Sequence, residues 1–197
     1  MSKADQLKQS LQPGQVYRRA QLAQWSNAVD RHLKQLLDDG TLVKLSGGLY
    51  HYPKQTAFGR APATDADLVR AFLKDDRFLI VSPNVYNALG VGTTQLYNQT
   101  RVYNHKRHGR FSLGGRSFDF HLKPTLPVTL DKAFLLVDLM NNLDSLAEDS
   151  LVIKERVRQQ VLSVDQEALL QAVSYYGKVS TKKFFSQCLS SFGADNG

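Results

Sequence analysis

The sequence of 197 residues is 42% hydrophobic and 22% charged, so nothing in its composition marks it as disordered, and its length suits one large domain or two small ones. A single cysteine, Cys188, excludes an internal disulfide and a cysteine-based zinc site, and it predicts a reducing, cytoplasmic setting. The formal net charge of +7 favours a polyanionic partner, and the lack of a long apolar run predicts no membrane association.

The N-terminal third predicts three short helices. The first carries Leu7 and Leu11 and is broken by Pro13-Gly14, and the second spans residues 18–24. The third, over residues 27–39, places apolar side chains on one face and polar or basic ones on the opposite face. The apolar set is Val29, Leu33, Leu36 and Leu37, and the opposite set is Asn27, Arg31, Lys34 and Gln35.

A β-hairpin is predicted directly after the third helix. Gly40 ends the helix, and the glycines at 47–48 form a turn between short strands over residues 42–45 and 49–52. Helix, tight hairpin and basic helix face together predict a winged helix-turn-helix. Residues 1–60 also hold nine Lys and Arg against four Asp, which favours an anionic partner.

This interpretation selects candidate DNA contacts. An α-helix fits the major groove, the start of the second helix would meet the phosphate backbone, and the hairpin turn would follow the neighbouring groove. The candidates are Arg18, Arg19, Asn27, Arg31, Lys34, Lys44, Ser46, Gly47 and Gly48. The alternative is a solvated basic face on a module that binds protein.

The rest of the chain predicts a second domain. Residues 54–63 show no periodicity and are interpreted as a linker, which divides the chain into domains 1–60 and 61–197. A helix capped by Thr64, a buried strand over 78–81, a short helix from Ser82 and β-structure over 93–123 follow. In the last strand, alternation predicts Phe118, Phe120 and Leu122 on one face. Helices are then predicted between about residue 130 and residue 191, one of them capped by Ser163. The predicted fold class is α+β, with an N-terminal winged helix-turn-helix, a mixed α+β domain and a helical C-terminal tail.

Residues 90–110 depart from ordinary core-and-surface alternation. They combine aromatic, amide and cationic side chains, a mixture suited to nucleic acid or to an acidic protein surface, although a solvated polar loop is equally compatible. The members of this second polar and basic surface are Tyr97, Asn98, Tyr103, Asn104, His105, Lys106, Arg107 and His108. No carboxylate or cysteine stands at ligand spacing from its two histidines, so no metal site is predicted.

Signatures of catalysis are absent from the sequence. It has no GxxxxGK[ST] phosphate loop, no HExxH zinc motif and no GxSxG nucleophile motif. Cys188 lies at helical spacing from Phe184 and Phe185, which predicts a buried thiol and not a nucleophile. The sequence therefore predicts neither an enzyme nor a cofactor.

Several blocks of the sequence resemble the AbiEi-type antitoxin family of bacterial type IV toxin-antitoxin systems. The first block is GQVYRRAQLAQWSNAVDRHLKQLLDDGTLVKLSGGLYHYPK, residues 14–54. The more specific block is FLIVSPNVYNALGVGTTQLYNQTRVYNHKRH at 78–108 with LGGRSFDFHL at 113–122, and a weaker likeness lies in YYGKVSTKKFF at 175–185. The resemblance covers nearly the full chain.

The resemblance implies a function in two parts. The N-terminal winged domain would bind inverted repeats of double-stranded DNA in its own promoter and repress it, with DNA contacts carried over to Arg18, Arg19, Asn27, Arg31, Lys34 and the turn at 46–48. The C-terminal domain would counter a nucleotidyltransferase toxin without depending on a stable complex, and no residue-level site carries over. The alternative is an RNA- or protein-binding adaptor that uses the 97–108 loop, with the winged domain as scaffold. A nuclease using His105 or His108 ranks third.

Overall fold

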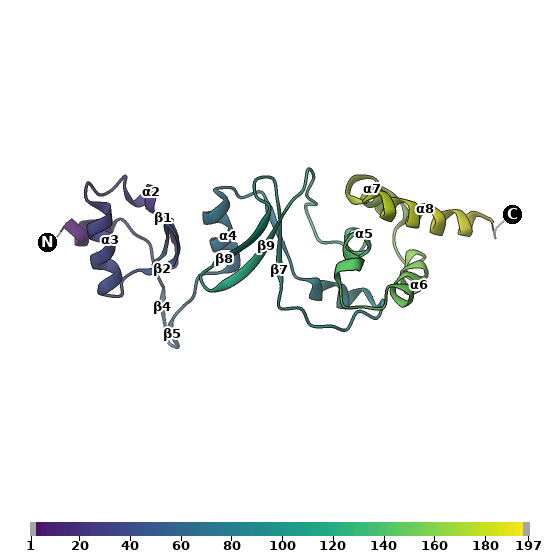
Figure 1. Ribbon diagram of the computed structural model, residues 1–197, viewed down its shortest axis with the longest axis horizontal. Helices are drawn as coiled ribbons and strands as arrows, with labels where there is room; N and C mark the ends of the chain where they lie inside the picture. The colour runs from purple at the N-terminus through teal and green to yellow at the C-terminus, as the bar shows by residue number, and fades with distance from the viewer. Residues whose placement is uncertain (1–2, 195–197) are drawn as a thin grey trace. The chain divides into compact units, whose positions relative to one another are not determined.

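The computed structural model describes residues 3–194, and the chain divides into two compact units (Figure 1). Unit 1 comprises the chain up to Ile80 together with Thr100–Leu122, and unit 2 comprises Val81–Gln99 and the chain from Lys123 onward. The fold class is α+β, as predicted, with a helical C-terminal segment. The predicted boundary near residue 60 lies inside unit 1, so the compact units divide the chain differently from the predicted domains 1–60 and 61–197.

Helices and short strands alternate in the N-terminal part of unit 1. In chain order they are α1 (Lys3–Gln9), β1 (Val16–Arg18), α2 (Arg19–Leu22), α3 (Val29–Asp38), β2 (Val43–Ser46) and β3 (Leu49–His51). The strands form an antiparallel sheet in the order β1-β3-β2, in which Tyr17 lies opposite Tyr50 and Val43 lies opposite His51. The central strand β3 therefore joins the predicted hairpin to a strand that precedes α2.

One apolar core holds these elements together, and all three helices and the sheet contribute to it. Its buried members are Leu7, Leu11, Tyr17, Leu22, Val29, Leu33, Leu36, Leu42 and Tyr50. The amphipathic pattern predicted for the third helix is confirmed, because Val29, Leu33 and Leu36 are buried and Leu37 is half-buried.

The start of α3 differs from the prediction. The helix begins after Ala28, whose side chain cannot accept a hydrogen bond, and not after Asn27 or Ser26. Ser26 stabilises the preceding turn instead, since its Oγ accepts from the Ala28 N–H at 3.3 Å and lies 2.6 Å from Nδ1 of His32. The side chain of Asn27 is consequently exposed beside the first turn of the helix.

Residues 55–60, predicted as part of a linker, form a small hairpin. Its strands are β4 (Gln55–Thr56) and β5 (Gly59–Arg60). The Thr56 hydroxyl donates to the Gly59 carbonyl at 2.8 Å, and Gly59 has a φ of 103°, which side-chain-bearing residues rarely adopt. Phe58 at the tip is fully exposed.

The second part of unit 1 packs one helix on a four-stranded sheet. Its elements are α4 (Asp65–Leu73), β6 (Phe78–Val81), β7 (Thr100–Asn104), β8 (Gly109–Leu113) and β9 (Arg116–Leu122), with the sheet order β6-β7-β9-β8. Strands β7 and β9 are parallel, and β8 and β9 are antiparallel. Thr64 caps α4 as predicted, with its hydroxyl accepting from the Asp67 N–H at 3.1 Å.

The face of this sheet that meets α4 is aromatic. The Phe72 ring of α4 lies 4.9 Å from the ring of Phe111 and 5.1 Å from that of Phe120. Phe118 and Phe120 are buried, as the alternation of β9 predicted. The same pattern was wrong for Leu122, the last residue of the strand, which is 53% exposed.

The two parts of unit 1 share a core, which explains why no compact boundary falls at residue 60. Leu49 of β3 is buried in one apolar cluster with Leu68 and Val69 of α4. The Leu45 carbonyl accepts from the Gly114 N–H at 2.9 Å, which ties β2 to the β8–β9 turn. These contacts join segments far apart in sequence, and a composition shift at the linker does not reveal them.

Unit 2 is helical. It contains a 3₁₀ helix η1 (Pro83–Leu89), then α5 (Lys132–Asn142), a short η2 (Leu143–Ser145), α6 (Ser150–Val161), α7 (Gln166–Tyr176) and α8 (Val179–Ala194). Aspartates at positions 131, 149 and 165 cap α5, α6 and α7 through hydrogen bonds to N–H groups of the first turn. The predicted cap of α7 at Ser163 was therefore wrong by two residues. Within residues 3–194, no helix combines the length and the apolar character needed to cross a membrane.

His51 makes the stability of unit 1 depend on pH. It is buried at the end of β3, and burial lowers its pKa below the ordinary value of 6.5, partly opposed by Asp67. As the pH falls through about 6.5, His51 of the unfolded chain becomes protonated, whereas buried His51 of the folded chain stays neutral. The folded state therefore loses stability as the pH falls from about 6.5 toward the lowered pKa.

We expect the urea midpoint of unit 1 to fall between about pH 7.5 and about pH 5.5, with a contribution from His51 of at most about 1.4 kcal/mol per pH unit. The fluorescence of Trp25, the only tryptophan, reports this transition. The fall of the urea midpoint should be smaller in His51→Gln than in the wild-type chain. In the control His105→Gln it should equal that of the wild-type chain, because His105 is exposed. An equal fall in wild type and His51→Gln would contradict the assignment.

Candidate nucleic-acid interface

The outer face of α3 presents two exposed cations. Asn27, Arg31 and Lys34 are exposed and lie on the side opposite the buried stripe of the helix. Within residues 3–194, neither Arg31 nor Lys34 has an ion-pair or hydrogen-bond partner for its side chain. Because the two positions are three apart, their side chains project from neighbouring turns of the same face. Both charges are available to an external anion.

Arg19 is exposed but already paired. Its Nε lies 2.7 Å from Oδ1 of Asp30 and its Nη2 lies 2.6 Å from Oδ2, a two-pronged contact between α2 and the first turn of α3. The hydrogen bond raises the pKa of Arg19 and lowers the pKa of Asp30. The Arg19 N–H also donates to the Gly48 carbonyl at 2.9 Å, so the start of α2 meets the hairpin turn.

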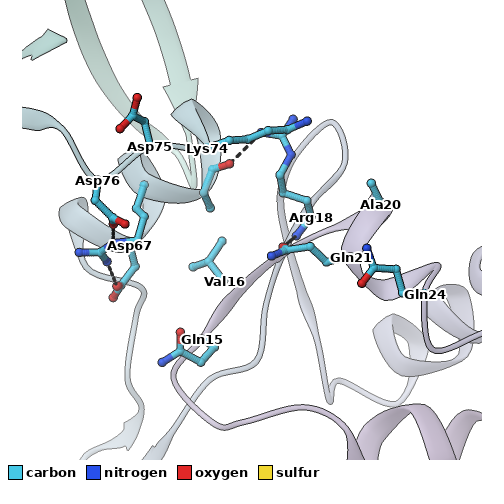
Figure 2. Close-up of a pocket in the computed structure, with 12 residues that line it drawn as sticks. Gln15, Val16, Arg18, Ala20, Gln21, Gln24, Asp67, Lys74, Asp75 and Asp76 are labelled. Atoms are coloured by element: carbon cyan, nitrogen blue, oxygen red, sulfur yellow. Dashed lines mark hydrogen bonds and ion pairs between the residues drawn. The ribbon is translucent and has the colours of Figure 1, made fainter. Parts of the chain in front are cut away.

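Arg18, predicted to contact the DNA backbone, is engaged inside unit 1. Its Nη1 donates to the carbonyl oxygens of Ala71 at 2.8 Å and Phe72 at 3.0 Å, at the C-terminal end of α4. Figure 2 shows Arg18 in the lining of the pocket next to this helix end. The last carbonyls of a helix have no intrahelical partner and carry partial negative charge, which a guanidinium offsets. Arg18 thus joins β1 to α4, and this role competes with the predicted contact to DNA.

We expect Arg18→Gln to lower the stability of unit 1 by about 1–2 kcal/mol, because two helix-end carbonyls lose a charged donor at a partly exposed site. Arg19→Gln is the matched control: it removes the same group from the next residue, where the ion pair with Asp30 is exposed to solvent, so little change is expected. Urea unfolding followed by Trp25 fluorescence measures both. Equal losses in the two variants would show that Arg18 does not hold α4.

The hairpin turn leaves room for a close approach. Gly48 has a φ of 73°, and a β-carbon added at Gly47 or Gly48 would meet no atom within 4 Å. Lys44 is exposed on β2, and Ser46 is half-buried. The register of the pairing between β2 and β3 shifts between these two residues. An open turn with a nearby lysine is compatible with a phosphate backbone lying along it.

The members of the second polar and basic surface are divided between the two units. Tyr97 and Asn98 belong to unit 2, whereas residues 103–108 belong to unit 1. Tyr97 holds its own loop in place, since its hydroxyl accepts from the Ala147 N–H at 3.0 Å and its N–H donates to Asn84 Oδ1 at 2.8 Å. Partial burial raises the pKa of the Tyr97 hydroxyl.

Asn104 has a structural role that was not predicted from the sequence. Its side chain is fully buried, and Oδ1 accepts from the N–H groups of Lys106 at 2.8 Å and Arg107 at 2.6 Å. Its Nδ2 donates to the carbonyls of Arg107 at 3.0 Å and His121 at 3.4 Å. An asparagine that bonds its own backbone two or three residues on is a known turn signal, so the polar residues after β7 could have indicated it.

The other members of this surface are partly engaged as well. Tyr103 is buried, and Lys106 Nζ donates to the Lys74 carbonyl at 2.9 Å and pairs with Asp75 at 3.2 Å. The Arg107 guanidinium lies 5.7 Å from the centre of the Phe72 ring. Lys106 therefore supports the end of α4 from one segment while Arg18 supports it from another.

His105 and His108 are the remaining members, and both are exposed. The His108 ring lies 5.6 Å from the ring of His121, which pairs with Asp119 at 2.9 Å. Among the described residues, no group of three His, Cys, Asp or Glu side chains is arranged to hold a metal ion.

A cavity of 480 Å³ lies between the β1–α2 segment and α4 (Figure 2). Its charged side chains are largely satisfied by one another: Arg70 bonds Asp67 at 2.9 Å and Asp76 at 2.6 Å. Hydrogen bonds from Arg77, and then from Lys106, hold the pKa of Asp75 well below its usual range, so this carboxyl is a poor proton donor at neutral pH. The cavity is therefore a polar contact region between the β1–α2 segment and α4.

The basic excess of the chain is confined to unit 1. That unit has seventeen Lys and Arg against nine Asp and Glu, a net charge of +8, whereas unit 2 has eight against nine, a net charge of −1. A field of this kind attracts polyanions to one unit only. The exposed cations of α3 lie in that unit.

Comparison of the chain with models of protein families, with curated proteins and with solved structures gives no match. The residues and their geometry are therefore the basis for assigning a function.

Proposed function

We propose that the N-terminal part of the chain is a winged helix-turn-helix that binds double-stranded DNA. The order helix, strand, helix, helix, strand, strand and the sheet order β1-β3-β2 support this fold, with α3 as recognition helix and the β2–β3 hairpin as wing. The observation that carries the proposal is the face of α3, where Arg31 and Lys34 are exposed opposite the stripe that packs into the core. Such a face can enter a major groove without disturbing the core.

The proposed target is an inverted-repeat operator upstream of the protein's own gene, and the proposed activity is autorepression in the bacterial cytoplasm. This part rests on the resemblance of residues 14–54 to the AbiEi-type antitoxins. The basic charge of unit 1 supports an anionic partner, and the open glycine turn supports a wing close to the DNA backbone.

The remainder of the chain is proposed to act as the antitoxin against a nucleotidyltransferase toxin. The support is the resemblance of residues 78–122 and 175–185, and no catalytic role is proposed for any residue. The adaptor alternative has less support, because the surface on which it depends is divided between the units and includes the buried Tyr103 and Asn104.

A reporter experiment tests both parts of the proposal. The protein's own upstream region is fused to a reporter gene, and the neighbouring toxin gene is expressed under separate control. The wild-type chain should silence the reporter and restore growth, whereas Arg31→Ala with Lys34→Ala should release the reporter and still restore growth. A reporter indifferent to the wild-type chain would refute autorepression, and failure of the wild-type chain to restore growth would refute the antitoxin part.

A further inference from the structure

Unit 2 contains a second cavity, with a volume of 310 Å³. Three elements surround it, namely helix α6, the C-terminal end of α5 and the N-terminal end of α8. Three cations line it: Lys154 and Arg158 from α6 and Lys183 from α8. Asp144 is the one carboxylate in its lining, and it is exposed. Arg158 also pairs with Glu155 at 3.0 Å, so the two lysines carry most of the positive charge of the cavity, although unit 2 as a whole carries a net charge of −1.

The start of α8 adds to this positive potential. Ser180 and Thr181 line the cavity from the first turn of the helix, where N–H groups have no intrahelical acceptor and the helix dipole is positive. The preceding residue, Lys178, has a side chain with no acceptor atom and cannot cap these groups. Its Nζ donates instead to the Asn141 carbonyl at 2.7 Å.

The hydroxyl of Thr181 is unsatisfied. The residue is only 2% exposed, and within the described part of the chain its Oγ1 has no hydrogen-bond partner. A buried hydroxyl without a partner destabilises a protein, so its presence in the lining of a cationic cavity indicates an acceptor that the protein itself does not supply. A ligand rich in acceptor oxygens would provide one.

We infer that this cavity binds the phosphate group of a small phosphorylated ligand. Phosphate oxygens accept from helix N-terminal N–H groups, from a hydroxyl and from lysine or arginine, all of which meet here. The apolar side chains of Met140, Leu143 and Phe184 line the same cavity and can contact the organic part of such a ligand. The volume of this concave site suits a small molecule, whereas the phosphates of a DNA duplex lie on its convex surface. This site is independent of the DNA-binding face of α3.

The test titrates the full-length chain with inorganic phosphate at constant ionic strength, followed by NMR chemical shifts of α8 residues. A nucleoside 5′-monophosphate is then compared with its unphosphorylated nucleoside, and duplex DNA serves as a further competitor. Phosphate should bind saturably with a Kd of about 1 mM or below, and the monophosphate more tightly than the nucleoside. No saturation by about 10 mM phosphate would overturn the inference, as would displacement of phosphate by duplex DNA alone.

Two variants and one control sharpen this test. Thr181→Val should weaken phosphate binding about tenfold while leaving the thermal midpoint of the free protein unchanged or raised, because an unpaired hydroxyl is replaced by a methyl group of similar size. Asp144→Asn should tighten binding, since a nearby negative charge is removed. Lys182→Gln, which alters an exposed neighbour outside the lining, should have little effect. Weakening by Lys182→Gln with no effect of Thr181→Val would overturn the inference, because it would show that only general charge attracts the anion.

Discussion

Replacing Arg31 and Lys34 together by alanine is expected to weaken binding to operator DNA by at least about 100-fold, because each side chain that meets a base or a phosphate contributes about 1–3 kcal/mol. Neither side chain has a partner within residues 3–194, so the fold should be unaffected and the urea midpoint unchanged. Fluorescence anisotropy with labelled operator DNA measures the affinity. The slope of log affinity against log salt should fall by about one for each phosphate that the variant no longer neutralises.

Lys8→Ala is the matched control for this variant. Lys8 is an exposed lysine of the same unit, but it lines a cavity with Asp39 and Gly40, just beyond the C-terminal end of α3. The substitution removes one positive charge without touching the first turns of that helix, so it should reduce the affinity only slightly. Comparable losses of affinity in Lys8→Ala and the double variant would mean that net charge, and not the face of α3, governs binding.

Phe120→Ala should lower the stability of unit 1 by about 3–5 kcal/mol, the usual range for a buried phenylalanine. The side chain is fully buried on the central strand β9, and its ring lies near the rings of Phe72, Phe111 and Phe118 at 5.1, 5.6 and 6.3 Å. Its removal would leave a cavity that neighbours held by α4 and β8 can fill only in part. Urea unfolding followed by Trp25 fluorescence measures the decrease in stability.

Phe58→Ala is the same substitution at a fully exposed site, the tip of the β4–β5 hairpin. The Phe58 side chain buries nothing in unit 1, so the urea midpoint should not change. A destabilisation in Phe120→Ala no larger than in Phe58→Ala would contradict the packing of α4 on the sheet.

Features that depend on local periodicity could be predicted from the sequence. The buried and exposed faces of α3 follow from a helical spacing within one segment, and the inward rings of Phe118 and Phe120 follow from strand alternation. The exposure of Leu122 could not be predicted, because alternation alone does not show that the last residue of a strand lacks packing neighbours. The hairpin at residues 55–60 is too short to show a period.

Features that depend on distant segments could not be predicted. Arg18 and Lys106 are basic residues in polar stretches, a setting that predicts contact with an external partner. Their side chains instead meet the carbonyls at the end of α4, more than thirty residues away in sequence in each case. Asn104 is different, since its bonds to the next two or three residues are local and turn chemistry could have indicated them.

Sequence-specific recognition of DNA by α3 is the central claim, and competition between two duplexes tests it most directly. The labelled DNA is the region upstream of the protein's own gene, and the competitors are the same region unlabelled and a scrambled duplex of equal length and composition, at physiological salt. The unlabelled upstream region should compete at least about 1,000-fold better than the scrambled duplex. Equal competition by the two duplexes would contradict the claim and leave only nonspecific attraction to a basic protein.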